Sequence, residues 1–515
     1  MSIAPWIDDV ALRTPDKIAL HCAGLRCSYA ALAHRIGERA AALHGAGVGR
    51  GDIVAWLGYN GSAQLAILFA CARLGAIFMP LNWRLTAFEH RAMLAAAMPR
   101  LCFVDEPFVA SCLHGDVLPR GSRGIALGGS HPPGWQAWDD FAVSIAGLVA
   151  PQPAIDPDSP LLLCYTSGST GQPKGALLSH AALGANADGS VHMHGMTDQD
   201  RVLTTLPLFH VGGLNILMTP ALRAGCTVTL HPKFEPDAWF DAVKRDGITL
   251  TVAVPAQLEM LLAHPRWADA DLSSLRMITT GSTTVRRPLI DAVHARGIPL
   301  VQVWGATETG PISAALCEGD ARRKAGSVGR AVPGVELSIV DGADQPLPAG
   351  QFGEVVVRGR NVTCGYFGDP QATQQALRGG WFHSGDGGHL DEEGYLWIEG
   401  RLKDMIISGG ENISPAEVES VLMECPQVAE AAVVGRPDER WGEAVIAVVV
   451  AQPGAELSGD ELLRRLQGRL ARFKHPKEIL VVDALPRTAL GKVRKDDVRK
   501  MVAARTPAAA TGVSI

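Results

Sequence analysis

The sequence predicts an α/β protein with two domains, and three observations support this. The chain of 515 residues is too long for one ordinary hydrophobic core. Residues 1 to about 150 alternate helical and strand patterns with short links, which is typical of a doubly wound, mostly parallel sheet. Near Arg401 the pattern changes to that of a smaller α+β unit. We therefore expect a large N-terminal domain over residues 1–400 and a small C-terminal domain over residues 401–515.

The composition is typical of a globular enzyme. Apolar residues make up 47% of the chain and the formal net charge is −6, which gives no indication of a nucleic-acid partner. The ten cysteines include no C-x-x-C pair, so we expect neither a zinc site nor disulfides, and a cytoplasmic location. No signal peptide is predicted. The most hydrophobic stretch, residues 65–81, contains Arg73 and Pro80 and predicts a core helix and a strand, not a transmembrane segment, although weak membrane contact is compatible with it.

The first predicted elements follow from the spacing of apolar residues. Residues 29–43 are rich in alanine and leucine at helical spacing. Residues 52–57 and 76–81 are apolar runs of strand length, and residues 64–74 between them predict a helix. A strand, a helix and a second strand in this order predict a parallel pair of strands.

A stretch rich in glycine and hydroxyl residues follows the next buried strand, which we place at residues 161–164. Glycines let a loop bring backbone N–H groups close to an anion, and a lysine can reach a phosphate. The stretch is not a Walker A loop, because Lys174 is followed by Gly175. A flexible surface turn is the alternative. We expect a loop that wraps a polyphosphate, with these candidate residues: Thr166, Ser167, Gly168, Ser169, Thr170, Gly171 and Lys174.

Three later strands each lead to candidate site residues. Residues 202–206 predict a strand before His210, and a lone histidine near apolar residues is usually a packed core residue. Residues 301–304 predict a strand before Glu308, which offers oxygen ligands suited to Mg²⁺. An exposed loop carboxylate is the alternative. A strand at residues 277–280 precedes a turn. Candidates in these turns are Gly281, Ser282, Trp304, Gly305, Ala306 and Thr307, and a further strand and helix are expected at residues 250–255 and 256–262.

The C-terminal part contains polar candidates and a helix signal. Asp386 could be a turn residue, but a carboxylate can also accept bonds from two vicinal hydroxyls, and Arg401 can pair with phosphate oxygens. Lys492 ends the pattern Arg-Thr-x-x-Gly-Lys, although lysines near a C-terminus are usually solvated. Ser414 and Glu417 predict a capping box. The other expected elements are a helix face of Val418, Val421, Leu422 and Cys425, strands at 431–434 and 445–450, and a helix at 461–470.

The stretch Tyr165–Gly175 resembles the signature loop of the adenylate-forming (AMP-binding) superfamily, which includes acyl-CoA and aryl-CoA synthetases, peptide-synthetase adenylation domains and firefly-type luciferases. The segments around Glu308, Asp386 and Lys492 resemble further motifs of this family in the family's order, so the resemblance covers nearly the whole chain. It implies a β-barrel-like part in the large domain. It also implies a mobile small domain, with the hinge near Lys403.

The resemblance implies roles for several of the candidates. It implies that Lys492 bridges carboxylate and phosphate, that Glu308 with Thr166 binds Mg²⁺, and that His210 lies beside the acyl pocket. Asp386 would hold the ribose hydroxyls of ATP and Arg401 the ribose or phosphate. The face used with CoA would carry Ser408, Gly409 and Gly410. Trp441 is a further candidate for contact with CoA, because an aromatic ring beside cations suits an adenine and its phosphate, but it could equally be a packing residue.

The resemblance implies an ATP-dependent acyl-CoA ligase, an acid–thiol ligase that forms an acyl-AMP and pyrophosphate before transfer to CoA. The predicted pocket segments, residues 209–215 and 277–284, are apolar or small, and Gly212 and Gly213 should leave room. A medium- or long-chain fatty acid and an aromatic acid such as a hydroxycinnamate both fit. The alternatives are an amino-acid-type adenylation or luciferase-like enzyme and a nonenzymatic ATP-binding protein. A homodimer is left open.

Overall fold

The computed structural model divides into two compact units. The C-terminal unit comprises Ile339–Val355, Gly385–His389 and Ile398–Ile515, and the N-terminal unit comprises the rest. The two units are therefore not separated by a single cut in the chain, and the predicted boundary at residues 400 and 401 stays a prediction. The structure describes residues 2–113, 118–128, 131–144, 149–151, 153–166, 173–282, 285–408, 411–438, 441–467, 469–470, 472–488 and 491–505.

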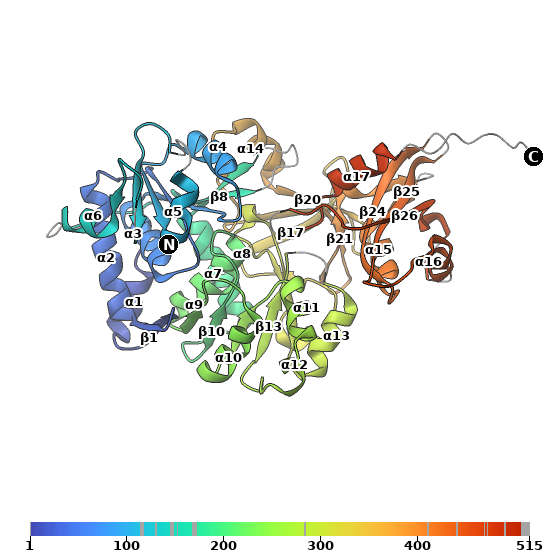
Figure 1. Cartoon of the computed structure of the whole chain (residues 1–515), viewed down its shortest axis with the longest axis horizontal. Coiled ribbons are helices and arrows are strands. Elements are labelled where there is room, and N and C mark those ends of the chain that lie inside the picture. The colour runs from blue at the N-terminus through green and yellow to red at the C-terminus, as the bar shows by residue number, and fades with distance from the viewer. Residues whose placement is uncertain are drawn as a thin grey trace, which may run out of the picture. The chain divides into compact units, whose positions relative to one another are not determined.

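The N-terminal unit contains an eight-stranded sheet with the order β19-β9-β8-β4-β3-β5-β6-β7. Figure 1 labels β8 of this sheet. Its central strands pair in parallel and are completely buried in β3 and β4, which explains their continuous apolar sequence. Only β8 with β9 and β9 with β19 pair antiparallel among the described strands of this sheet. Its strands are β3 Ile53–Leu57, β4 Ile77–Leu81, β5 Leu101–Asp105, β6 Arg123–Leu127, β7 Gln136–Ala137, β8 Pro160–Thr166, β9 Lys174–Ser179 and β19 Gly365–Tyr366.

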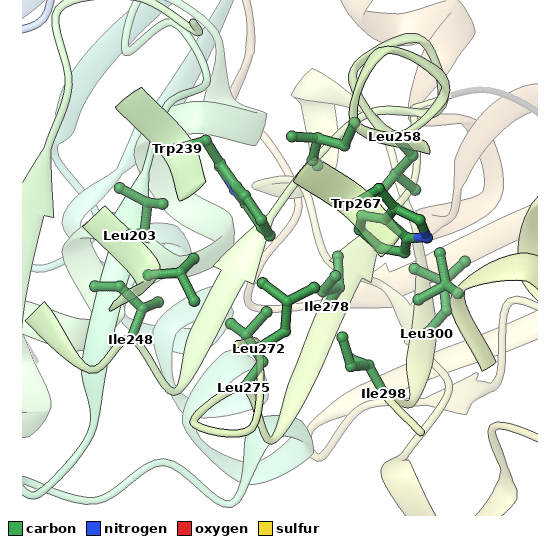
Figure 2. Close-up of a cluster of buried hydrophobic side chains, with 14 of the residues drawn as sticks. Leu203, Trp239, Ile248, Leu258, Trp267, Leu272, Leu275, Ile278, Ile298 and Leu300 are labelled. Carbon is green, nitrogen blue, oxygen red and sulfur yellow. The ribbon is translucent and has the colours of Figure 1, made fainter. Parts of the chain in front are cut away.

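A nine-stranded sheet, in the order β16-β15-β14-β13-β12-β10-β11-β1-β2, forms the second layer of strands in this unit. Buried side chains gather around Ile278 on β13, with Trp239 and Trp267 among them, as Figure 2 shows. This cluster holds the strands that lead to the predicted site. The strands are β1 Ile18–Cys22, β2 Leu25–Ser28, β10 Arg201–Thr204, β11 Thr227–Leu230, β12 Leu250–Val252, β13 Met277–Thr280, β14 Leu300–Trp304, β15 Ala314–Ala315 and β16 Arg330–Ala331.

The helices of the N-terminal unit confirm the predicted alternation. The α2 helix begins after Ser28, whose side chain accepts a hydrogen bond from the backbone N–H of Ala31 at 3.2 Å, an ordinary N-cap. The helices are α1 Trp6–Arg13, α2 Tyr29–Gly45, α3 Ser62–Leu74, α4 Ala87–Ala97, α5 Glu106–Leu113, α6 Trp138–Ser144, α7 His180–His194, α8 Val211–Gly213, η1 Leu214–Met218, α9 Thr219–Ala224, α10 Pro236–Asp246, α11 Pro255–Ala263, α12 Arg266–Asp269, α13 Arg287–Ala295, η2 Thr307–Thr309, η3 Glu318–Asp320, α14 Pro370–Ala376 and η4 Arg378–Gly380.

A further sheet has four strands in the order β17-β18-β20-β21, and the β-barrel-like part that the resemblance implied stays a prediction. The strands of this sheet contain residues of both units. They are β17 Val335–Val340, β18 Gly353–Gly359, β20 Phe382–Leu390 and β21 Leu396–Arg401.

The C-terminal unit contains a sheet with the order β23-β22-β25-β24, and β26 pairs with β25 in parallel. The predicted helix face is confirmed for Val418 and Leu422, which are at most 1% exposed and share one apolar cluster. Val421 packs against this cluster but is only partly buried, and Cys425 belongs to the cluster but follows the end of α15 at Met423. The elements are η5 Leu402–Asp404, β22 Ile406–Ser408, β23 Glu411–Ile413, α15 Pro415–Met423, β24 Val428–Asp438, β25 Gly442–Ala451, α16 Gly459–Leu466, η6 Arg472–Lys474, β26 Glu478–Val482 and α17 Lys495–Ala504.

The predicted capping box at the start of α15 is wrong. Ser414 is the N-cap residue and Pro415 takes the first helical position. The Ser414 hydroxyl, however, donates to the backbone carbonyl of Glu399 at 2.5 Å. Glu417 instead accepts a hydrogen bond from Lys474 Nζ at 2.7 Å. Tertiary partners have replaced the local ones.

The hydrophobic stretch at residues 65–81 forms α3 and β4 in the buried core, as expected. Among the described residues, no helix has both the length and the apolar character needed to cross a membrane.

Candidate active site

The predicted polyphosphate loop joins two antiparallel strands. Thr166 at the end of β8 lies opposite Lys174 at the start of β9. The Thr166 hydroxyl donates to the Lys174 carbonyl oxygen at 3.4 Å. The hairpin stem therefore holds both ends of the loop. The predicted phosphate-binding residues Ser167, Gly168, Ser169, Thr170 and Gly171 lie outside the described residues.

Tyr366 joins Glu308 to Lys174. Its hydroxyl donates to Glu308 Oε1 at 2.7 Å. Lys174 Nζ lies 5.2 Å from the centre of the Tyr366 ring, within the range of a cation–π interaction. Glu308 is only 9% exposed, so its carboxylate is held in a largely desolvated place. All three residues belong to the N-terminal unit.

The donor chemistry of Glu308 fits the predicted Mg²⁺. Tyr366 occupies one carboxylate oxygen, and no residue in the described part of the chain donates a hydrogen bond to the other, Oε2. Mg²⁺ prefers oxygen ligands and is commonly held by one or two carboxylates together with substrate phosphates. Glu308 could supply one such oxygen, and the predicted contribution of Thr166 stays a prediction.

The connection from β18 to α14 fixes the turn that carries Glu308. The backbone N–H of Thr363 donates to the Glu308 carbonyl at 2.7 Å, and the Thr363 hydroxyl donates to the Leu177 carbonyl on β9 at 2.6 Å. The side chain of Asn361, which is completely buried, donates to the Thr309 carbonyl at 2.9 Å. The turn is thus bound to the strand that follows the predicted phosphate loop.

Backbone packing explains two of the predicted glycines. A Cβ on Gly305 would lie 1.9 Å from the Pro311 carbonyl oxygen, and one on Gly281 would lie 2.6 Å from the Val303 carbonyl oxygen. Ser282 has φ of 77°, a left-handed conformation that is uncommon for a non-glycine residue and often marks a functional turn. Of the other candidates, Trp304 is the last residue of β14, and Ala306 and Thr307 follow it in the turn that leads to Glu308.

His210 immediately precedes α8 and the π-helical turn η1, a distortion found frequently at functional sites. The His210 ring lies 4.5 Å from the Phe209 ring, centre to centre. The structure therefore places His210 in an aromatic setting at the start of the predicted pocket segment, and its role stays a prediction.

The two glycines after His210 differ in their surroundings. Among the described residues, a Cβ on Gly212 would meet Ile216 Cδ1 alone, at 3.8 Å, so this part of the structure leaves open space beside the glycine. A Cβ on Gly213 would lie 2.2 Å from the Pro207 carbonyl oxygen. The prediction that both glycines leave room is wrong for Gly213, because backbone packing already fills that space.

Asp386, Arg401 and Lys492 form a charged group within the C-terminal unit. Arg401 Nε lies 2.8 Å from Asp386 Oδ1, and the Asp386 side chain is 15% exposed. Lys492 is exposed as a residue. Although the residue as a whole is exposed, its ammonium group is partly desolvated, and this is the main effect that lowers the pKa of Lys492 from its ordinary value. The charge of Arg401 lowers the pKa further, and the charge of Asp386 raises it. The structure therefore brings together three residues that the sequence places up to about a hundred positions apart.

The predicted CoA-facing residues lie around the junction of β22 and β25. Ser408 is 5% exposed and pairs with Gly442 at the start of β25. Trp441 is 37% exposed, and Lys477 Nζ lies 5.1 Å from the centre of its ring. Gly409 and Gly410 lie outside the described residues.

Sequence reasoning missed Tyr366. The hydrogen-bonded residues Tyr366 and Glu308 are 58 positions apart, and no periodic pattern connects them. The sequence offered only a weak signal for a functional role of Tyr366. The chain contains five tyrosines, and this one follows a glycine, Gly365.

The chain belongs to the AMP-binding enzyme family. The family model of the AMP-binding enzyme matches residues 7–367, and the model of the AMP-binding enzyme C-terminal domain matches residues 417–492. These matches confirm the resemblance that the sequence motifs predicted and identify the chain as an enzyme of this family.

Individual relatives match nearly end to end. The indoleacetate–CoA ligase of Aromatoleum aromaticum is 54% identical, covering 98% of this chain and 99% of that protein. A feruloyl-CoA synthase of an Amycolatopsis species is 40% identical, covering 97% and 98%. The solved structure of the o-succinylbenzoate CoA synthetase MenE of Bacillus subtilis, in complex with the acyl-adenylate intermediate OSB-AMP, has a TM-score of 0.84 and 31% identity over 96% of this chain and 97% of that one. These similarities confirm the predicted α/β fold.

Proposed function

We propose that this protein is an AMP-forming acyl-CoA ligase that activates an aromatic carboxylic acid of the indoleacetate or hydroxycinnamate type. The observation that carries the proposal is the 54% identity with indoleacetate–CoA ligase over 98% of the chain. The 40% identity with feruloyl-CoA synthase supports the aromatic class of acid.

The reaction has two steps. A carboxylate oxygen of the acid attacks the α-phosphorus of ATP, and the bond to the bridging oxygen breaks, which releases pyrophosphate and leaves an acyl-AMP. The thiol sulfur of CoA then attacks the acyl carbon, loses its proton to solvent or buffer, and AMP leaves. The first step transfers no proton, so it depends on positioning and on positive charge near the reacting phosphorus.

The residues of the N-terminal unit would bind the triphosphate. Lys174 and Thr166 flank the predicted phosphate loop. Glu308 would hold the Mg²⁺, which neutralises phosphate charge when bound. His210 and the open space at Gly212 would adjoin the acid.

The residues of the C-terminal unit would bind the adenosine half and complete the first step. The Asp386 carboxylate would accept hydrogen bonds from the ribose hydroxyls, and Arg401 beside it would contact ribose or phosphate. Lys492 would place its charge between the carboxylate and the α-phosphate. We further propose that the unit changes its orientation near Lys403 between the steps, after which Ser408 and Trp441 would face CoA.

The acid itself is best identified with a panel of substrates. The purified protein should release pyrophosphate fastest with planar aromatic acids, including indoleacetate and ferulate, and slowly with alkyl acids of equal carbon number. In the alkyl series, a gain in binding free energy of roughly 0.8 kcal/mol per buried methylene is expected only if the pocket accommodates an extended alkyl group. A rate that rises steadily with alkyl length and exceeds the aryl rates would replace the aromatic assignment with a fatty acid.

A further inference from the structure

We propose that Tyr366 is a positioning residue that sets the orientation of Glu308 and thereby the Mg²⁺ requirement of ATP binding. This inference rests on the proposed function, since it assigns Glu308 to the metal of MgATP. It concerns a side chain that the sequence motifs did not single out.

The geometry of the carboxylate carries the first step of the argument. The Tyr366 hydroxyl donates to Glu308 Oε1 at 2.7 Å, and Glu308 is 9% exposed. A bond from a hydroxyl to a largely buried carboxylate restricts the rotation of that carboxylate. The described residues leave Oε2 without a donor, so the hydroxyl decides which oxygen faces a cation. Groups of this kind, which hydrogen-bond a metal-binding carboxylate, orient the ligand and tune metal affinity.

The backbone around Tyr366 carries the second step. Tyr366 lies on β19, where it pairs with Ala176 on β9. The backbone N–H of Tyr366 also donates a hydrogen bond to Thr373 Oγ1 at 2.9 Å. Thr363, three residues earlier, donates to the Glu308 carbonyl at 2.7 Å. The donor and the acceptor of the Tyr366–Glu308 bond are therefore both held by backbone contacts, so the bond does not depend on a flexible loop.

The ring of Tyr366 has a separate role. Lys174 Nζ lies 5.2 Å from the ring centre, so the ring holds a cation from the base of the phosphate loop beside the residue that orients Glu308. The hydroxyl and the ring can be tested separately, because Tyr366→Phe removes the first and keeps the second, whereas Tyr366→Leu removes both.

The experiment measures ATP binding by calorimetry without any carboxylic acid, so that no turnover occurs. ATP is titrated into the parent, Tyr366→Phe and Tyr366→Leu at a series of Mg²⁺ concentrations and in EDTA. Mg²⁺ should increase the affinity for ATP, and the Mg²⁺ concentration that gives half of this increase is the quantity compared. We expect Tyr366→Phe to raise this concentration by about 10- to 100-fold, the usual effect of removing a residue that hydrogen-bonds a metal ligand. Its affinity for ATP in EDTA should equal that of the parent. Tyr366→Leu should weaken binding in EDTA as well, because Lys174 loses its platform.

The matched control is Tyr395→Phe. The Tyr395 hydroxyl donates to Asp320 Oδ2 at 2.5 Å, and Tyr395 is 2% exposed, so this variant also deletes a hydroxyl–carboxylate bond in the same unit. Its Mg²⁺ dependence should match the parent. The inference is overturned if Tyr366→Phe keeps the parental Mg²⁺ dependence, or if it loses the same affinity with and without Mg²⁺. A parent that binds MgATP but forms no acyl-AMP with any acid would instead overturn the proposed function, and the binding data would still decide the role of Tyr366.

Discussion

Arg401 Nε lies 2.8 Å from Asp386 Oδ1, so the two residues assigned to the ribose and phosphate of ATP already form an ion pair with each other. Arg401 is 53% exposed and Asp386 15%, so the carboxylate is the better-held member. The ion pair holds the Asp386 carboxylate in place. This arrangement leads to the first prediction.

Asp386→Ala should weaken ATP binding and remove the preference for the ribose hydroxyl. The parent should bind 2′-deoxy-ATP less tightly than ATP by roughly 1.5–3 kcal/mol, the usual value of a hydrogen bond to a charged group. The variant should bind both nucleotides equally weakly. Calorimetry with the two nucleotides measures this. The control Glu336→Ala removes another carboxylate paired with an arginine, Arg358, on an exposed surface. The ribose assignment fails if Asp386→Ala still prefers ATP to 2′-deoxy-ATP as the parent does.

The pH dependence of adenylation should report the charge of Lys492. Its pKa is lowered from the ordinary 10.5, by desolvation first and by Arg401 second. The protonated form supplies the positive charge, so the rate should be highest at lower pH and fall as the pH rises through this lowered pKa. Lys492→Arg should lose this alkaline fall, because a guanidinium stays protonated. Pyrophosphate release measured against pH tests it. An alkaline limb that is the same in both proteins would assign the titration to another group.

Lys492→Ala should impair only the first step. Loss of one electrostatic partner in a transition state costs roughly 2.7–4 kcal/mol, or about 10²–10³ in rate. Supplied with synthetic acyl-adenylate and CoA, the variant should form thioester at nearly the parental rate. Rapid-quench chromatography separates the two steps. Equal losses in both steps would contradict the assignment of Lys492 to adenylation alone.

Substitution by alanine should have different effects at Gly213 and at Gly212, the neighbouring glycines of the predicted pocket segment. Gly213→Ala places a Cβ 2.2 Å from the Pro207 carbonyl oxygen. Overpacking of this kind typically costs about 1–3 kcal/mol, so the melting temperature should fall. In the part of the chain that the structure describes, the Cβ of Gly212→Ala meets Ile216 Cδ1 alone, at 3.8 Å, so the stability of this variant should be kept while kcat/KM falls most for the bulkiest acids. Scanning calorimetry measures the melting temperatures, and the panel of acids measures kcat/KM. If Gly212→Ala leaves the order of acids unchanged, the open space beside it is not part of the acid pocket.

Buried histidines should make the protein less stable in mild acid. Burial lowers the pKa of His194 to about 4, and His194 Nε2 lies 2.8 Å from Thr279 Oγ1 beneath the site strand β13. The unfolded chain therefore binds this proton first, so stability is full above pH 6.5 and declines as the pH falls toward 4, by on the order of 3 kcal/mol. Unfolding followed from pH 7.5 to 5 should show this. His194→Gln should flatten the slope, and His34→Gln, whose side chain is 76% exposed, should not.

The sequence predicted what depends on local pattern and missed what depends on distant contacts. Alternating strands and helices such as β3, α3 and β4 follow from buried apolar runs, and their positions are correct within two residues. The capping box failed because Ser414 found a tertiary acceptor, Glu399. The difference between Gly212 and Gly213 depends on the Pro207 carbonyl, and Tyr366 acts across 58 positions. Neither of these two contacts produces a periodic pattern in the sequence from which it could be predicted.

The nucleotide products of a single turnover test the central claim most directly. The purified protein is mixed with MgATP and its best aromatic acid, with and without CoA, and the quenched mixture is separated by chromatography. Without CoA, the account predicts pyrophosphate and protein-bound acyl-AMP in equal amounts; with CoA, it predicts free AMP and the acyl-CoA thioester. Formation of ADP and phosphate, or of thioester without prior acyl-AMP, would contradict it.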